Sequence, residues 1–145
     1  MTDNERRIAL RDERVKAAPY WGAVEPRIIL TFLFFAAAWI TVIVLGINGT
    51  IPLWVGLILN TVIASTFYMP MHEATHGNIW GQTSKGKWVE DLIGMLCAIP
   101  LGFSYKAHRP SHMRHHAHTN DPQRDPDYHT AGPMWTVLRS WYAQV

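Results

Sequence analysis

Histidines with the spacing of metal ligands dominate the second half of this chain. In "HEATHG", His72 and His76 stand four residues apart, so on a helix they project from one face. In "SHMRHH", His112, His115 and His116 stand at positions i, i+3 and i+4, so a helix would direct all three the same way. The chain has eight histidines, and none occurs in the first 71 residues: His72, His76, His108, His112, His115, His116, His118 and His129.

The stretch "HEATHG" fits two incompatible templates. As H-E-x-x-H it indicates a zinc protease helix in which Glu73 activates water. As H-x-x-x-H it is one part of a histidine-rich iron site, and Glu73 is incidental. One catalytic zinc takes about three protein ligands and keeps a position open, so five imidazoles favour two metal ions or one unusually histidine-rich site. Imidazole binds iron, zinc and copper alike, so the ligand type does not identify the metal. The alternative to a built metal site is a solvated histidine-rich loop that binds metal adventitiously.

Two long apolar segments precede the histidines. The chain has no charged residue and no histidine between Ile28 and Met71. Residues 28–47 and 51–70 are each long enough, at about 1.5 Å per residue, to cross the roughly 30 Å hydrocarbon core of a bilayer. The intervening Asn48-Gly49-Thr50 has turn chemistry. The pattern predicts a hairpin of two transmembrane helices, because two buried helices of a soluble core would normally carry a polar stripe.

The basic residues predict how this hairpin is oriented. Six Lys and Arg precede residue 28, seven follow residue 70, and the turn has none. Both termini should therefore be cytoplasmic, with residues 1–27 as a cytoplasmic amino-terminal segment and residues 71–145 on the cytoplasmic face. The long polar segment before the first span argues against a cleaved signal peptide. The net charge is only +2, and the basic residues do not form a basic face with aromatic residues that could stack on bases. We therefore expect no nucleic-acid partner.

Shorter elements complete the expected fold. The apolar stretch 92–103 is too short to cross a bilayer and predicts an interfacial or re-entrant helix. If it crossed, the two histidine groups would lie on opposite sides of the membrane. Pro110 suits a first helical turn and predicts a helix that begins just before His112. An aromatic helix at the membrane surface is indicated by four residues at helical spacing, Trp135, Leu138, Trp141 and Tyr142. The single Cys97 is expected to be a small buried hydrophobe.

The predicted fold class is therefore an all-α integral membrane protein. It comprises a hairpin of two transmembrane helices, a short interfacial or re-entrant helix and a cytoplasmic histidine-rich helix.

The order of these features resembles the membrane fatty acid desaturase and hydroxylase superfamily. "HEATHG" at the end of a span is followed, after 35 residues, by "HMRHH" and "TNDPQRDPD", and the resemblance covers residues 28–135. It implies a single desaturase-like domain over residues 1–145, with histidine boxes at the cytoplasmic ends of helices and two non-haem iron ions. No catalytic residue is expected beyond the metal ligands. The implied metal ligands are His72, His76, His112, His115 and His116.

The resemblance also implies roles for neighbouring residues. Glu73 becomes a hydrogen-bond acceptor beside the ligands and no longer a general base. The carboxylates of "NDPQRDPD" are turn formers beside prolines, and the resemblance adds a role in orienting ligand imidazoles through their other nitrogen. These carboxylates are Asp121, Asp125 and Asp127. The histidines expected outside the ligand set are His108, His118 and His129.

One departure from the superfamily affects what the chain can do. Its members carry a third box, H-x-x-H-H, further along, and this chain has no histidine after His129. Either the chain is a truncated piece of a longer protein, which is our expectation, or the remaining ligands come from another chain. Alone, it should bind one iron poorly and have little or no activity.

The chemistry implied is the O2-dependent oxidation of an unactivated C–H bond, which needs a metal. The first expectation is desaturation of fatty acyl chains in lipid metabolism. Because "HTAGPMW" resembles carotenoid ring hydroxylases, a carotenoid (beta-ring) hydroxylase is the alternative. A membrane zinc metalloprotease with H-E-x-x-H is a further alternative function. The partners implied are the lipid bilayer, an acyl or carotenoid substrate and a small electron donor such as a ferredoxin or cytochrome.

Overall fold

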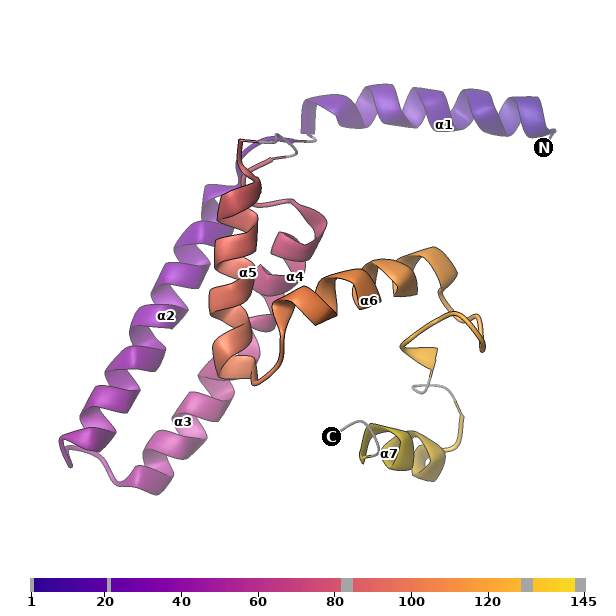
Figure 1. Ribbon diagram of the computed structural model, residues 1–145. Helices are drawn as coiled ribbons and strands as arrows, with labels where there is room; N and C mark the ends of the chain where they lie inside the picture. Colours follow the sequence, from indigo (N-terminus) through magenta and orange to yellow (C-terminus); the bar gives the residue numbers. More distant parts are fainter. Residues whose placement is uncertain (1, 21, 82–84, 129–131, 143–145) are drawn as a thin grey trace. The chain divides into compact units, whose positions relative to one another are not determined.

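The regular secondary structure of the described residues consists of helices alone, in agreement with the predicted all-α class. The structure is a computed structural model that describes residues 2–20, 22–81, 85–128 and 132–142, and no strand occurs within these ranges (Figure 1). The chain divides into two compact units, residues 1–103 and 104–145, which are described separately. The elements of the first unit are α1 (Asp3–Ala17), a 3-10 turn η1 (Ala18–Tyr20), α2 (Pro26–Ile47), α3 (Leu53–Thr66), α4 (Tyr68–His76) and α5 (Lys87–Leu101). The second unit contains α6 (Tyr105–His118) and α7 (Met134–Tyr142).

Within the described residues, two helical segments are long and apolar enough to cross a membrane. They are Pro26–Ile47, which is α2, and Leu53–His76, which is α3 continued by α4. Helices α2 and α3 pack against each other and are joined by a short loop (Figure 1). Only 6% and 17% of the residues in their most apolar windows are buried, whereas a core helix of a soluble protein would be mostly covered. Their long exposed apolar surfaces fit a lipid surrounding.

The second segment is shifted along the chain relative to the predicted range of 51–70. It begins at Leu53 because Pro52 takes the N-cap position, and it continues to His76. The junction between α3 and α4 has a local cause: Pro70 has no N–H to donate to the carbonyl of Thr66, four residues earlier. Phe67 nevertheless keeps right-handed helical angles, with φ −69° and ψ −16°. The first histidine pair therefore lies on a direct continuation of the second apolar helix.

Helix α5 covers one side of α4. Met71 and Ala74 of α4 and Cys97 of α5 are fully buried, and the burial of Cys97 agrees with the prediction. Helix α5 begins at Lys87, five residues before the predicted stretch, and an ion pair between Lys87 and Asp91 at 2.7 Å supports its first turn. Its 15 residues reach roughly 22 Å, which is short of a bilayer's hydrocarbon core.

Helix α6 begins earlier than predicted, and the expected start just before His112 is wrong. The helix starts at Tyr105 because Ser104 caps it: the Ser104 hydroxyl accepts the Ala107 N–H at 3.4 Å. Pro110 lies inside the helix, where it removes one hydrogen bond without ending it.

The carboxy-terminal region forms the helix that its spacing predicts, α7. The side chains of Trp135 and Leu138 are exposed. The side chains of Trp141 and Tyr142 and all of His129 lie outside the described residues.

A left-handed glycine ends α4 directly after the histidine pair. Gly77 has φ +73°, and its N–H donates to the carbonyl of Ala74 at 3.2 Å. The N–H of Asn78 donates to the carbonyl of Glu73 at 3.0 Å, which completes a Schellman motif. This turn brings the Asn78 side chain back onto the helix that it follows.

We predict that Gly77→Ala lowers the free energy of unfolding by about 1 kcal/mol, because a Cβ is strained in the left-handed conformation. The measurement is thermal unfolding of the detergent-solubilised protein. Gly46→Ala is the control, since a Cβ there would meet only Leu53, at an ordinary 3.7 Å. Equal losses in the two variants would contradict this explanation.

Candidate metal centre

The first unit presents a pair of histidines on one face of α4. The ring centroids of His72 and His76 lie 4.6 Å apart, and both side chains are half-buried. The Nδ1 of His72 lies 3.1 Å from Glu73 Oε1. Because a carboxylate can only accept, this contact places the proton on Nδ1 and directs metal coordination to Nε2. His72 therefore has the orientation that a metal ligand needs.

Glu73 is engaged through both carboxylate oxygens. Oε1 accepts from His72, and Oε2 accepts from the Asn78 side-chain amide at 2.8 Å. A zinc protease would instead need this carboxylate to face a metal-bound water. The geometry thus agrees with the expectation that Glu73 is a hydrogen-bond acceptor beside the ligands, and it does not favour the protease interpretation.

A buried carboxylate that the sequence analysis did not identify supports this pair. Glu90 of α5 is only 2% exposed, and its Oε1 accepts the N–H groups of Ile79 at 3.0 Å and Trp80 at 2.7 Å. It thereby holds the segment that follows α4 and Asn78. The sequence feature that could have identified Glu90 is its position. Glu90 shares the buried face of α5 with Val89 and Ile93, and the other residues of that face are apolar.

The second unit gathers three imidazoles on α6. The Nε2 atoms of His112 and His116 lie 3.0 Å apart, and the ring centroids of His115 and His116 lie 5.6 Å apart. His112 is buried, at 8% exposure. His108 stacks on His112 with a centroid distance of 5.2 Å, so this residue touches a predicted ligand from the preceding turn. Helical periodicity alone brings this group together, as its spacing predicted.

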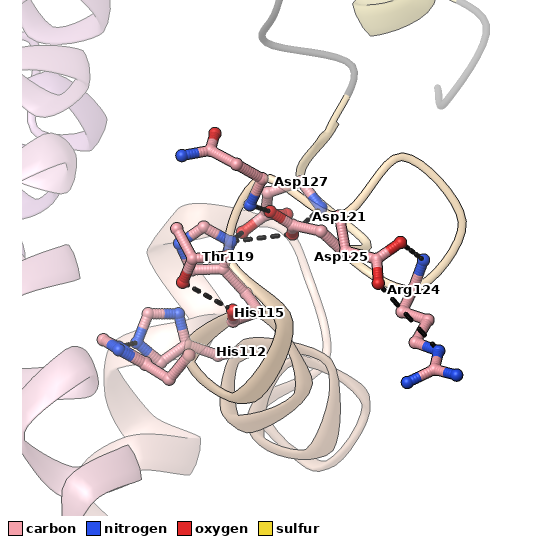
Figure 2. A network of polar contacts seen from close by, with 9 residues as sticks. His112, His115, Thr119, Asp121, Arg124, Asp125 and Asp127 are labelled. Carbon is pink, nitrogen blue, oxygen red and sulfur yellow. Dashed lines mark hydrogen bonds and ion pairs between the residues drawn. The ribbon is translucent and has the colours of Figure 1, made fainter. Parts of the chain in front are cut away.

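A hydrogen-bonded carboxylate fixes the ring of His115 (Figure 2). His115 Nδ1–H donates to Asp125 Oδ1 at 2.8 Å. Asp125 also accepts the backbone N–H groups of Asn120 and Asp127, each at 2.8 Å. Its side chain is 2% exposed, so Asp125 is a buried acceptor that orients His115, and its role goes beyond forming a turn.

Asp121 and Asp127 behave differently from Asp125 (Figure 2). Asp121 accepts the N–H groups of Gln123 at 2.9 Å and Arg124 at 3.2 Å, which is the predicted turn-forming role. The carboxylate of Asp127 lies 3.6 Å from His115 Nδ1 and is exposed. Ligand atoms of His115, Asp125 and Asp127 lie within 4.8 Å of one another, close enough to hold a metal ion. Among the described residues, no such group includes His118.

The pairing of His115 with Asp125 changes how both groups titrate. The hydrogen bond from His115 to Asp125 raises the pKa of His115, and partial burial of the ring only partly opposes it. Burial tends to raise the pKa of Asp125, but its hydrogen bonds to His115, Asp127 and Asn120 together hold it below the ordinary value. With Nδ1 protonated by this contact, a metal ion must displace the second proton from Nε2, so metal affinity should rise with pH.

Comparisons with known proteins identify the family of this chain. The sequence profile described as "Fatty acid desaturase" matches residues 48–145. The chain belongs to the fatty acid desaturase family.

Individual members of this family match about half of the chain. Zeaxanthin 4-ketolase of Chlamydomonas reinhardtii is 32% identical over 78 residues, which are 53% of this chain and 16% of the ketolase. The sn-1 oleoyl-lipid 12-desaturase of Anabaena variabilis is 32% identical over 75 residues, 52% of this chain and 20% of the desaturase. The chloroplastic omega-6 fatty acid desaturase of Glycine max is 36% identical over 69 residues, 48% of this chain and 15% of that enzyme.

The chain thus spans about a fifth of the length of these relatives. No solved structure matches it significantly. Family membership confirms the resemblance drawn from the two histidine motifs.

We predict that Asp125→Asn weakens metal binding by roughly 10- to 100-fold, because losing a carboxylate behind a ligand imidazole has effects of that size. The measurement is titration of Fe(II) into the purified protein under anaerobic conditions. Asp121→Asn is the control, since the Asp121 carboxylate accepts the N–H groups of Gln123 and Arg124 in its own turn. Unchanged affinity in Asp125→Asn would contradict the orienting role.

We predict that Glu90→Ala lowers the free energy of unfolding by about 2 kcal/mol or more, since two N–H groups lose their buried acceptor. Glu90→Gln keeps an oxygen at that position and should lose much less. Chemical unfolding followed by tryptophan fluorescence measures both variants. A large and equal loss in both would show that the negative charge, and not the acceptor, is what matters.

Proposed function

We propose that this chain is part of a membrane-bound non-haem iron oxidoreductase that uses O2 to desaturate fatty acyl chains. The observation that carries the proposal is the orientation of two imidazoles: His72 and His115 each direct Nδ1 at a carboxylate, which leaves Nε2 as the coordinating nitrogen. This carboxylate–imidazole arrangement is typical of protein metal sites. Family membership favours iron over zinc and copper, which imidazole would also bind.

The proposed ligands come from both units of the chain. His72 and His76 would contribute from α4, and His112, His115 and His116 from α6. That both groups serve one di-iron centre rests on the family and not on the placement of the units. Because the matched segment is about a fifth of each relative, further ligands should lie outside these residues, and residues 1–145 alone should bind iron weakly and turn over little or no substrate.

The proposed membrane arrangement follows from charge and length. Helices α2 and α3 would cross the bilayer as a hairpin, with basic residues at both of its open ends on the cytoplasmic side. Helix α5 would be interfacial or re-entrant, because its 15 residues are too few to cross. Both histidine groups and both termini would then be cytoplasmic.

The residues of this chain would hold the iron ions and orient the imidazole rings. Iron with O2 would supply the oxidation of a C–H bond, which side chains cannot perform. Glu73 and Asp125 would keep the imidazole rings turned toward the metal. The apolar helices would admit a lipid chain sideways from the bilayer and keep water from the reacting carbon. A small electron donor such as a ferredoxin or cytochrome would complete the reaction.

Two substrate classes are supported, and fatty acyl chains come first. The relatives in Anabaena variabilis and Glycine max are named sn-1 oleoyl-lipid 12-desaturase and omega-6 fatty acid desaturase. A carotenoid is the second candidate, because zeaxanthin and beta-carotene ketolases match a similar share of the chain. Carotenoid ring oxidation would use the same ligands on a different apolar substrate.

Expression of the gene product that contains these residues, in host membranes, tests the proposal. We expect about two bound iron ions by elemental analysis, with losses of iron in His76→Ala and His115→Ala. His118→Ala is the control and should keep its iron. New double bonds in the membrane fatty acids support the first candidate, and oxidised carotenoids in a carotenoid-producing host support the second.

Glu73→Gln separates the proposal from a zinc protease. The iron enzyme should keep its metal in this variant, with weaker binding, whereas a protease would keep zinc and lose all cleavage. Stoichiometric zinc and no iron in the wild type would refute the proposal.

A further inference from the structure

The segment that precedes α2 crosses the segment that follows α4, within the first unit (Figure 1). The N–H of Glu25 donates to the carbonyl of Ile79 at 2.8 Å, and the backbone of Gly22 lies directly against Gly81. We propose that this crossing orients the imidazole of His72 and that Gly81 is a positioning residue of the metal site, an inference that rests on the function proposed above. The crossing would act through the polar contacts that lead from this loop back to α4.

Only glycine fits at position 81. A Cβ there would overlap the carbonyl group of Gly22, far inside the 3.0 Å that real Cβ atoms keep from other atoms. Both residues also have left-handed backbones, with φ +82° at Gly22 and φ +83° at Gly81. The obstacle is backbone and not a side chain that could rotate away. Any larger residue at Gly81 must therefore move one segment relative to the other, by on the order of 1 Å in so closely packed a place.

The backbone of Ile79 transmits such a movement. Its N–H donates to Glu90 Oε1 at 3.0 Å, its carbonyl accepts the N–H of Glu25, and its side chain is completely buried. Glu25 is itself the N-cap of α2, where its side chain accepts the N–H of Arg27 at 3.1 Å. The loop after the histidine pair is therefore held from two sides, by the start of α2 and by α5.

Asn78 links the position of this loop to the orientation of a ring. It directly precedes Ile79, and its side-chain amide donates to Glu73 Oε2 at 2.8 Å, while Glu73 Oε1 accepts from His72 at 3.1 Å. The Asn78 side chain is exposed, so water competes for the same carboxylate, and the contact depends on a backbone that keeps the amide in place. A shift of about 1 Å would take the amide beyond hydrogen-bonding range. Glu73 would then lose the donor that holds its second oxygen.

Anaerobic titration of Fe(II) into the purified gene product that contains these residues measures the consequence. Gly81→Ala should weaken iron binding about fivefold, the factor that corresponds to one ordinary hydrogen bond. Gly102→Ala is the matched control. Gly102 has φ +75°, so alanine suffers the same backbone strain there, but its Cβ would meet no atom of a more distant described residue within 4 Å. The control should lose thermal stability and keep its iron affinity.

A double-mutant cycle tests the proposed route. Asn78→Ala removes the donor to Glu73 directly and should also weaken iron binding about fivefold. If Gly81 acts through Asn78, the double variant loses about fivefold and not about 25-fold, because the second change removes nothing further. Glu25→Pro takes the place of Gly81→Ala in the cycle if that variant does not fold. Proline lacks the N–H that Ile79 accepts, and the N–H of a helix N-cap has no partner within its own helix.

The ring of His72 gives a readout that does not depend on metal. In metal-free protein labelled with 15N-histidine, NMR distinguishes the two tautomers, and His72→Ala assigns the signal. We expect the Nδ1–H tautomer at His72 in the wild type and in Gly102→Ala, and a mixture of both tautomers in Gly81→Ala. A general loss of folding would alter all histidine signals, whereas loss of this contact should alter mainly that of His72.

Two outcomes would overturn the inference: an iron affinity and a His72 tautomer in Gly81→Ala that equal those in Gly102→Ala, or additive losses in the double variant. If the wild type holds zinc and no iron, the proposed function fails, and the same cycle with Zn(II) still decides whether the crossing orients His72.

Discussion

The hydrogen bond between an imidazole Nδ1 and a carboxylate is the interaction on which the candidate site depends. A histidine ring can rotate and can carry its proton on either nitrogen, so a bare cluster of histidines is poorly prepared for a metal. Glu73 and Asp125 remove that freedom for one imidazole in each unit. Asp125 is itself held by two backbone N–H groups, so the constraint extends from the turn after α6 to the ring of His115.

Packing supplies the second constraint, on the helix that carries the first pair. Helix α4 has only nine residues and would be marginal in isolation. It is stabilised because one face is buried against α5 and because it continues an apolar helix on its amino-terminal side. The buried Glu90 then fixes the chain just beyond Gly77, where a loop could otherwise pull Asn78 away from Glu73. Helix α5 also packs beside α2 around an apolar cavity of about 200 Å³, to which it contributes Leu96, Ile99 and Pro100.

Features set by local periodicity could be predicted from the sequence. The absence of charge between Ile28 and Met71 predicted two apolar helices, and histidine spacings of three and four residues predicted one-sided groups. Boundaries that depend on competing local signals were less certain: Ser104 as a cap outweighed Pro110 as a helix start. The roles of Glu90 and Asp125 depend on which backbone groups the folded chain brings to them, and no spacing rule encodes that. The assignment of the five metal ligands stays a prediction.

Because α4 continues α3, the length of this apolar helical segment sets the position of the histidine pair. Every residue added to or removed from this rod would move the histidine pair by about 1.5 Å and turn it by roughly 100°. A loop elsewhere can change length without such an effect. Insertions and deletions should therefore be tolerated in the turn after Ile47 but not between Leu53 and His76. The length of this helical segment sets both the position of the two imidazoles along the helix axis and the direction in which they point.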